Sequence, residues 1–477
     1  MSGHDRYESP LGTRYASPEM QRLFGAANRV ALWRRIWIAL AESEKELGVP
    51  IPDAAIAEMK AKAGDVDFDL AAEYEARFRH DVMAHVHAFG DVAPSARPYL
   101  HLGATSAFVT DNADLVVVRD ALRLVLQRLG AVVRALAGFA ETWRDLPTLA
   151  YTHLQPAQLT TVGKRATLWM QDFAQDVHEL QYRIAEFSFL GCKGTTGTQA
   201  SFLSLFAGDH SKVRRLDQLI ARRMGFDRVV PVSGQTYPRK LDLLLLGALA
   251  SIAQSASKMA ADIRILQHEG EVLEPFEAEQ IGSSAMPYKR NPMRCERIAS
   301  LSRFVMHLPA NAAETAAQQW FERTLDDSAN RRIVLPEAFL ATDAVLILAE
   351  NVARGLEVRE PVVRQHVRRE LPFMATEECV MRGVAAGGDR QTLHEIVRRH
   401  SMNVARAIAE EGAENNLLDR LAADPAFRGV DIAGVARTLH PRNYIGRASE
   451  QVGEFLRDVV APLLGQLSEA PPSEVRV

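Results

Sequence analysis

The chain has 477 residues, of which 47% are hydrophobic and 24% are charged, enough to bury the cores of two or three domains. Its formal net charge of -4 at pH 7 comes from interspersed acidic and basic residues, which disfavours a nucleic-acid-binding surface or a membrane-binding basic face. The three cysteines are isolated and lack metal-ligand spacing, so we expect neither disulfides nor a zinc site, and a reducing, cytoplasmic compartment.

The first 108 residues predict short helices interrupted by prolines, and we expect them to form an N-terminal helical domain. Their beginning lacks the apolar stretch of an export signal. Near their end, the segment HLGATSAFVTDNADL places Thr105 and Ser106 just before a predicted helix. Hydroxyls and backbone amides at a helix start can bind a carboxylate, although N-capping alone would also explain these residues.

Apolar residues at alternating spacings of three and four predict very long helices between residues 109 and 357. The two longest seams are Leu115, Val118, Leu122, Val125, Leu129, Val132, Leu136, Phe139 and Trp143, then Leu245, Leu249, Ile252, Ala256, Met259, Ile263 and Leu266. Shorter seams cover residues 164–187 and 335–356, and no stretch of comparable length alternates with period two. The most apolar run, 243–253, is too short to span a membrane.

These seams predict an all-α fold with a central long-helix bundle at 109–357. Their apolar surface exceeds what one bundle can cover, which favours a homo-oligomer; a monomer with merely long helices is the alternative. Gly355 to Pro361 indicates a boundary, so residues 358–477 are expected to form a C-terminal helical domain, in which no motif is recognisable. The last residues, EAPPSEVRV, predict a frayed tail.

Residues 150–164, AYTHLQPAQLTTVGK, place His153 in a proline-containing loop before a helix. A histidine can exchange protons near neutral pH, which is the chemistry of a general acid or base. A lone histidine is more often a hydrogen-bonded structural residue, so the pattern by itself leaves both roles open.

The segment 281–297, IGSSAMPYKRNPMRCER, is the most informative in the chain. Its glycine and prolines exclude a regular helix and predict an exposed, deformable loop. Asn291 and Pro292 predict a helix that starts with Asn as N-cap and Pro as its first residue. Ser283 and Lys289 on such a loop could act on an anion, although a solvated turn can contain the same residue types.

The run GSSAMPYKRNP at 282–292 closely resembles the signature of the fumarase/aspartase superfamily, whose members eliminate fumarate or a close relative. The segments around His153 and at 101–115 resemble its other two signature segments, in the same order. Within the superfamily the chain resembles the animal-type branch of the adenylosuccinate lyase family. This likeness is carried by SPLGTRYASPEM near the start, RHDVMAHVH at 79–87, KGTTGTQASF at 193–202, SGQTY at 233–237, WFERTLDDSANRR at 320–332 and ELPFMATE at 370–377.

The resemblance implies a carbon-nitrogen lyase that releases fumarate from adenylosuccinate and from the succinylated imidazole-carboxamide ribonucleotide of purine synthesis. It implies Ser283 as general base, His153 as general acid, and Lys289 as a source of positive charge for the carbanion-like intermediate. It places His80 beside the substrate. Further substrate contacts are implied for Arg79, Asp81, Thr105, Ser106, Thr152 and Gln235, and at the nucleotide end for Arg14, Tyr15, Arg297, Arg323, Ser328 and Arg332.

No metal or organic cofactor is implied, because the elimination needs neither and no metal-ligand or dinucleotide-binding pattern is present. The resemblance implies a homotetramer whose sites each combine residues from three subunits. Two alternatives remain. The first is a sister lyase such as argininosuccinate lyase, which binds no phosphate; the arginine- and serine-rich segment 320–332 argues against it. The second is a non-catalytic structural protein, which the intact Ser283, His153 and Lys289 disfavour.

Overall fold

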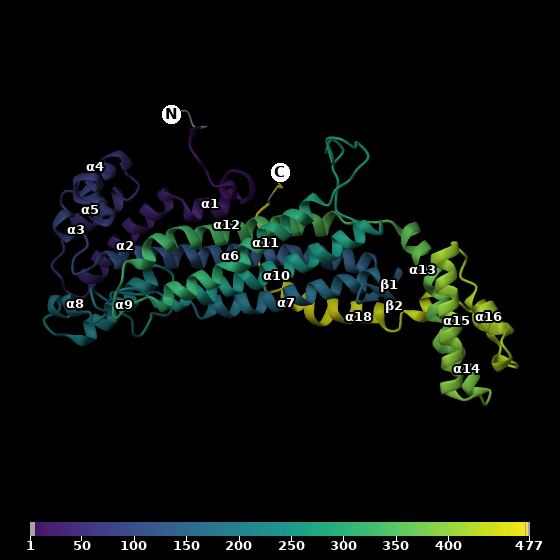
Figure 1. Ribbon diagram of the computed structural model, residues 1–477. Helices are drawn as coiled ribbons and strands as arrows, with labels where there is room; N and C mark the ends of the chain where they lie inside the picture. The colour runs from purple at the N-terminus through teal and green to yellow at the C-terminus, as the bar shows by residue number, and fades with distance from the viewer. Residues whose placement is uncertain (1–4, 473, 476–477) are drawn as a thin grey trace.

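Five long helices form the centre of the protein, as the computed structural model shows for residues 5–472, 474 and 475 (Figure 1). They are α6 (Ser106–Thr142), α7 (Val162–Ala185), α10 (Lys240–His268), α11 (Met293–Ala317) and α12 (Asp326–Gly355). Along the bundle, α6 packs against α7, α10 against α11, and α11 against α12. The all-α prediction with long central helices is therefore confirmed.

The heptad seams lie in the bundle core, as expected. Leu122 and Leu129 of α6 and Leu249 and Ile252 of α10 are all 0% exposed. The seam at 335–356 predicted a helix from residue 335, but α12 already begins at Asp326 and continues through Pro336.

Shorter elements cover one end of the bundle. Before α6 lie a π-helical turn η2 (Leu11–Tyr15), α1 (Pro18–Phe24), α2 (Ala26–Glu46), α3 (Asp53–Ala61), α4 (Phe68–Phe78), α5 (Asp81–Val92) and η3 (Arg97–Tyr99). Two further helices, α8 (Ala200–Leu205) and α9 (His210–Arg223), lie at the same end as α3 to α5 (Figure 1).

A β-hairpin follows α6 at the opposite end, in a region where no strand was predicted. Strand β1 (Pro147–Thr152) pairs antiparallel with β2 (Gln155–Thr161), with a bulge at Ala150 and Tyr151. The hairpin escapes a period-two search because both strands are short and β2 contains Pro156. Strands β3 (Val272–Leu273) and β4 (Glu357–Val358) form a smaller pair near the same end.

The C-terminal residues divide into two groups. Helices α13 (Glu360–Met374), α14 (Thr376–Ala385), α15 (Arg390–Glu411), α16 (Leu417–Ala423) and α17 (Ile432–Arg437), with η4 (Pro425–Phe427) and η5 (Pro441–Tyr444), surround a small core of their own. In contrast, α18 (Ala448–Phe455), η6 (Leu456–Val460) and α19 (Ala461–Leu464) lie along the central bundle, with α18 against α7 (Figure 1). The domain limits at 108 and 357 stay a prediction.

The predicted fraying of the tail is wrong for its described part. The carbonyl of Pro471 accepts a hydrogen bond from Arg128 of α6, and Val475 packs against the bundle core. Residues 473, 476 and 477 of that tail lie outside the described residues.

Helix α10 is, among the described residues, the one helix long and apolar enough to cross a membrane by composition. Of its most apolar window, 56% is buried inside the molecule, as is usual for a core helix. All three cysteines, Cys192, Cys295 and Cys379, are free and buried, and burial raises the pKa of the Cys379 thiol to about 11.

Candidate active site

A cavity of about 480 Å³ opens at the end of the bundle covered by α4 and α5. Its walls come from the α4–α5 turn, the first turns of α6 and the start of α12. The cavity brings together seven of the residues predicted from the sequence: Arg79, His80, Asp81, Ser106, Arg323, Ser328 and Arg332.

The turn between α4 and α5 presents three of these residues. Arg79 ends α4 in the left-handed conformation, with φ 55, which turns the chain sharply into α5. His80 caps α5, and its Nδ1 accepts from the Met83 backbone nitrogen at 3.3 Å. In the neutral imidazole the proton is then on Nε2, which remains available as a donor. Asp81 accepts a 2.8 Å hydrogen bond from Arg332.

The start of α6 offers an anion-binding feature. Thr105 is the N-cap residue, yet its side chain makes no capping bond, and no acidic residue stands in the first turn. Ser106 and Thr110 of this first turn line the cavity. The free N–H groups and helix dipole at such a terminus suit a carboxylate, in agreement with the predicted role of this segment.

A buried ionic network beneath the cavity was not predicted. Arg239 donates to both carboxylate oxygens of Asp111 at 2.9 and 3.1 Å, and through Nε to Asp327 at 2.6 Å. The other oxygen of Asp327 accepts from Arg323 at 2.7 Å. Asp327 is 0% exposed and is itself bound to Arg239. Its contact therefore holds Arg323, the predicted phosphate ligand, in a fixed position.

The network continues through Arg331, which donates to Asp242 at 2.7 Å and to Asp114 at 3.2 Å. The Tyr237 hydroxyl donates to Asp242 at 2.7 Å. Burial raises the pKa values of Asp114 and Tyr237, which favours their neutral forms. The spacing of four between Asp327 and Arg331 could have suggested a shared helix face, but their partners come from distant segments that the sequence does not pair.

The cations and anions of this cavity nearly balance. Six arginines and five carboxylates line it, so its formal charge is low for a substrate with a phosphate and two carboxylates. Three of the cationic residues that the resemblance implies at the site, Arg14, Lys289 and Arg297, are not among the residues that line this cavity.

The signature loop at 281–291 is pinned at its base. A Cβ on Gly282 would lie 2.0 Å from the Lys289 carbonyl oxygen, so only glycine permits this close approach. The Asn291 side chain donates to the Gly282 carbonyl at 2.7 Å. The prediction of Asn291 as N-cap is wrong because its amide closes the loop, and α11 begins at Met293 after Pro292.

Within the loop, the Ser283 oxygen accepts from the backbone nitrogens of Ala285 and Met286 at 3.4 and 3.2 Å. Donors aimed at a hydroxyl oxygen stabilise its deprotonated form, which is what a serine base requires. The local geometry is thus compatible with the predicted role of Ser283.

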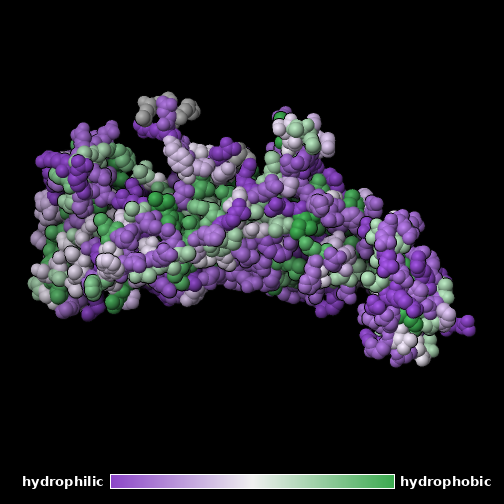
Figure 2. All heavy atoms as spheres, in the orientation of Figure 1, coloured by the Kyte–Doolittle hydropathy of each residue, from purple (hydrophilic) through white to green (hydrophobic). Residues whose placement is uncertain are grey.

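The loop stands away from the bundle between α10 and α11 (Figure 1). Lys289 is exposed, and so are the apolar residues Ile281, Met286 and Tyr288, at 77%, 48% and 84%. Figure 2 shows hydrophobic residues on this projecting loop. Exposed apolar side chains of this kind mark a contact surface.

His153 lies at the tip of the β1–β2 hairpin, where a simple loop had been predicted. His153 and Leu154 form a two-residue turn with φ 55 and 57. A left-handed conformation costs about 1–2 kcal/mol for a residue with a side chain. His153, Leu154 and the neighbouring Thr152 are exposed, so the hairpin holds the predicted acid out from the surface.

The predicted acid lies far from the cavity of the same chain. Ser106 begins α6 and the hairpin follows its end, so the 37 residues of this helix separate them by about 55 Å at about 1.5 Å per residue. Likewise, the 29 residues of α10 separate Gln235 from the signature loop by about 43 Å.

Gln235 marks the meeting of three segments that carry the family resemblance. Its side chain donates to the Thr195 carbonyl, and its backbone nitrogen donates to the Glu322 carbonyl, both at 3.0 Å. Segments 193–202 and 320–332 are thereby joined through 233–237.

The remaining predicted residues form a separate group. The Arg297 guanidinium lies over the Tyr15 ring at 5.7 Å, and Arg14 is exposed beside them. Arg297 is near the start of α11, whereas Arg323 follows its end, so the predicted nucleotide ligands also fall at two places in one chain.

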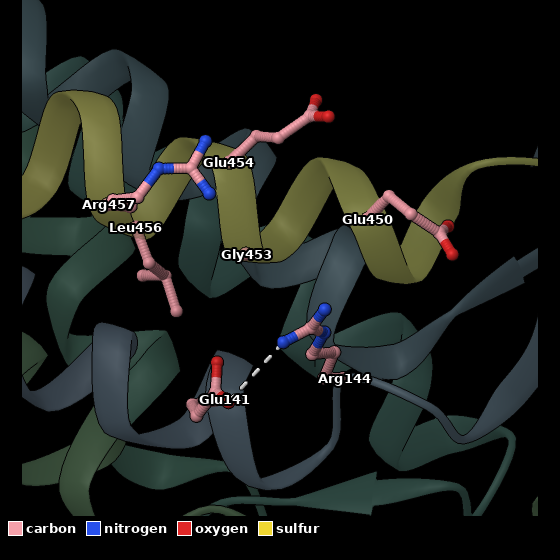
Figure 3. Close-up of a pocket in the computed structure, with 7 residues that line it drawn as sticks. All are labelled: Glu141, Arg144, Glu450, Gly453, Glu454, Leu456 and Arg457. Carbon is pink, nitrogen blue, oxygen red and sulfur yellow. Dashed lines mark ion pairs between the residues drawn. The ribbon is translucent and has the colours of Figure 1, made fainter.

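A second hollow, of about 580 Å³, lies between the end of α6 and α18 and contains none of the predicted residues (Figure 3). Three glutamates and two arginines line it, and its Glu141 and Arg144 form a 3.7 Å ion pair. This charge mixture does not suit an anionic substrate. In the described part of the chain, no group of three or more His, Cys, Asp or Glu side chains could hold a metal ion.

Comparisons with known proteins agree with the resemblance. A family described as "Lyase" matches residues 34–307, and one described as "Adenylosuccinate lyase C-terminus" matches residues 372–455. Proteins named adenylosuccinate lyase from Schizosaccharomyces pombe and Saccharomyces cerevisiae are each 49% identical, over 98% and 96% of this chain and 98% and 95% of theirs. The one from Schistosoma mansoni is 47% identical over 97% of both chains.

Solved structures share the fold. A fumarate lyase from Mesorhizobium sp. BNC1 superposes with a TM-score of 0.79 at 25% identity, covering 97% of this chain and all of that one. A 3-carboxy-cis,cis-muconate lactonizing enzyme from Pseudomonas putida reaches 0.80 at 24% identity, over 94% and 98%, and supports the fold alone. The full-length similarity and the matching family descriptions show that this chain belongs to the adenylosuccinate lyase family, within the fumarase/aspartase superfamily.

Proposed function

We propose that the protein is a carbon-nitrogen lyase that cleaves adenylosuccinate to AMP and fumarate, and cleaves the succinylated imidazole-carboxamide ribonucleotide in the same way. The observation that carries this proposal is the 49% identity over almost the whole chain to relatives of that name. The cavity supports it, because its arginines from 320–332 suit a phosphate.

In the proposed reaction, the Ser283 oxygen removes a proton from the succinyl carbon adjacent to the carbon that bears the nitrogen. The electron pair of the broken C–H bond is delocalised onto the adjacent carboxylate and then forms the C=C bond of fumarate. As the C–N bond breaks, its own electron pair leaves on the nitrogen, which His153 protonates. The two amides that donate to the Ser283 oxygen support its role as base.

Charge on the carboxylate must be stabilised as the proton leaves. Lys289 and the uncapped start of α6, with Thr105 and Ser106, are the proposed groups. His80, fixed as an Nε2 donor by its contact to Met83, would orient the substrate, with Arg79 and Asp81 beside it in the cavity wall. No metal or organic cofactor takes part in the proposed steps.

We further propose that each site combines residues from three subunits of a homotetramer. The separations of about 55 and 43 Å along α6 and α10 support this arrangement, because they keep the acid away from the cavity, and the base away from Gln235, within one chain. So do the exposed His153 and the exposed apolar residues of the signature loop. Leu168 and Phe304 of the bundle are also exposed hydrophobic residues, which provide further surface for such contacts. Figure 2 shows hydrophobic residues along the bundle surface.

The test is to incubate the protein separately with adenylosuccinate, its imidazole-carboxamide counterpart and argininosuccinate, and to follow fumarate. We expect fumarate from the first two and none from the third. Release from argininosuccinate alone would assign the chain to the sister activity, and no release from any would favour a structural protein. We propose a cytoplasmic location and no nucleic-acid or membrane partner, in line with the composition.

A further inference from the structure

The segment that carries Arg14 and Tyr15 is held to the bundle at Ser17. The Ser17 backbone nitrogen donates to the carboxylate of Asp343 in α12 at 2.7 Å, and both residues are buried. The Ser17 hydroxyl also caps α1 by accepting from the Met20 nitrogen at 3.2 Å. Since Ser17 lies two residues after Tyr15, its contact with Asp343 fixes the point at which the segment meets the bundle.

Asp343 in turn depends on Arg128 of α6. Both side chains are 0% exposed, and Arg128 Nε lies 3.5 Å from Asp343 Oδ1. Burial raises the pKa of Asp343, while its contacts with Ser17 and Arg128 oppose that rise. A buried charge that loses its partner is strongly destabilising, so the two side chains hold each other in place.

The C-terminal tail also contacts Arg128. Its Nη1 donates to the Pro471 carbonyl at 2.5 Å. On the way there, Leu467 covers Gly130, where an added Cβ would lie 2.9 Å from the leucine Cδ1. The tail beyond α19 therefore crosses α6 at Gly130 and Arg128, and its described end lies on the same side of the bundle as α1 (Figure 1).

We infer that the C-terminal tail, residues 465–472, is a latch that positions the nucleotide-binding segment Arg14–Tyr15 through the buried pair Arg128 and Asp343. The chain of contacts is continuous from Pro471 to Arg128, Asp343 and Ser17. Arg128 and Asp343 are positioning residues, remote from the reacting atoms. The inference rests on the proposed function for the role of Arg14 and Tyr15, so the latch acts on substrate affinity and leaves the chemical step unchanged.

The Ser17→Pro and Ser17→Ala variants test the contact with Asp343 as a matched pair. Both lose the hydroxyl cap, but only proline loses the backbone N–H. Ser17 has φ -66 and Ala16 has ψ 153, so the backbone angles suit proline, and its ring Cδ takes the place of the hydrogen that Asp343 accepts and displaces that carboxylate. We expect Ser17→Pro to raise KM for adenylosuccinate about 10-fold over Ser17→Ala, with kcat within about two-fold.

Two truncations test the tail. Ending the chain after Ala470 removes the Pro471 carbonyl, whereas ending it after Pro472 keeps that carbonyl. We expect the shorter protein to show the same rise in KM as Ser17→Pro, and the longer one to match the full chain. In Ser17→Pro and in the protein that ends after Ala470, amide hydrogen exchange across residues 9–16 should become faster, while exchange in α10 stays the same.

Amide exchange keeps this test separate from the test of the proposed function. If the full chain releases no fumarate from adenylosuccinate, the proposed function fails, and the exchange rates still decide on the latch. Equal KM and equal exchange in Ser17→Pro and Ser17→Ala would overturn the inference. So would a truncation after Ala470 that lowers kcat and leaves KM unchanged. If that truncation does not fold, the Ser17 pair decides.

Discussion

The two ends of the bundle differ in how far they are organised for function. At one end, the cavity rests on a buried network in which Asp111, Asp327 and Asp242 are each bound to an arginine. At the other, His153 projects from the tip of the β1–β2 hairpin, and the signature loop projects from a base closed by Asn291. One end thus forms a rigid site suited to an anionic ligand, and the other, in the proposed tetramer, would supply reactive groups to a neighbouring subunit.

The strongest test of this contrast is Ser283→Ala, because it removes the proposed base and no cationic contact. We expect turnover with adenylosuccinate to fall roughly a hundred- to ten-thousand-fold or more, with substrate binding still measurable by calorimetry. The adjacent Ser284→Ala is the matched control and should keep most of the activity. A Ser283→Ala protein that retained a third of wild-type turnover would move the base to another residue.

Mixing two inactive variants tests whether the outward groups serve another subunit. His153→Ala and Ser283→Ala proteins, combined in equal amounts under subunit exchange, should recover about one quarter of wild-type activity, because in the proposed tetramer a competent site takes its histidine and serine from different chains. Mass measurement verifies the exchange. No recovery in exchanged assemblies would place both groups of a site in one chain.

The cavity end is probed by Arg323→Met and Arg332→Met. Each should raise KM about 10- to 100-fold for both purine-pathway substrates, because these share the phosphate that the arginines are proposed to bind. Arg398→Met, at an exposed arginine in α15, is the control. If either cavity variant spared one of the two substrates, its arginine would not bind the common phosphate.

The smallest expected effect concerns Glu44 of α2, near the cavity end of the bundle. Unlike Asp111, Asp242 and Asp327, this carboxylate has no arginine partner among the described residues. It is 0% exposed, and neither oxygen has a hydrogen-bond partner among the described residues. Burial raises its pKa from 4.5 to about 9. The folded state therefore holds a proton that the unfolded state releases, so this contribution to stability is complete below pH 4.5 and is lost as pH rises toward 9.

Replacing Glu44 by glutamine should remove that pH dependence. Between pH 6 and 8.5, Tm should fall by about 2–5 °C less in Glu44→Gln than in the wild-type protein, as followed by calorimetry. Glu73→Gln, at an exposed position of α4, is the control and should behave as wild type. Parallel pH profiles for Glu44→Gln and wild type would show that Glu44 is ionised in the folded protein.

How much of the fold and of the candidate site could be predicted depends on how far apart in the sequence the interacting residues lie. The seams of α6 and α10 repeat within one helix, so the sequence predicts both helices. The hairpin at His153 was missed because its turn is His-Leu rather than a glycine-containing pair, and the strain of two left-handed residues is not visible in the sequence. The Arg239 network was missed because its acidic partners, Asp111 and Asp327, come from segments over 80 residues away on either side.

The burial of all three cysteines has a practical consequence. Thiol reagents meet no exposed sulfur on the folded chain, so the wild-type protein provides a silent background for covalent labelling. A cysteine introduced at Leu154, which is 70% exposed at the hairpin tip, or at Tyr288, which is 84% exposed on the signature loop, would be the preferred site for a fluorophore. Each label would report, in real time and without any substrate, when another molecule covers that part of the surface.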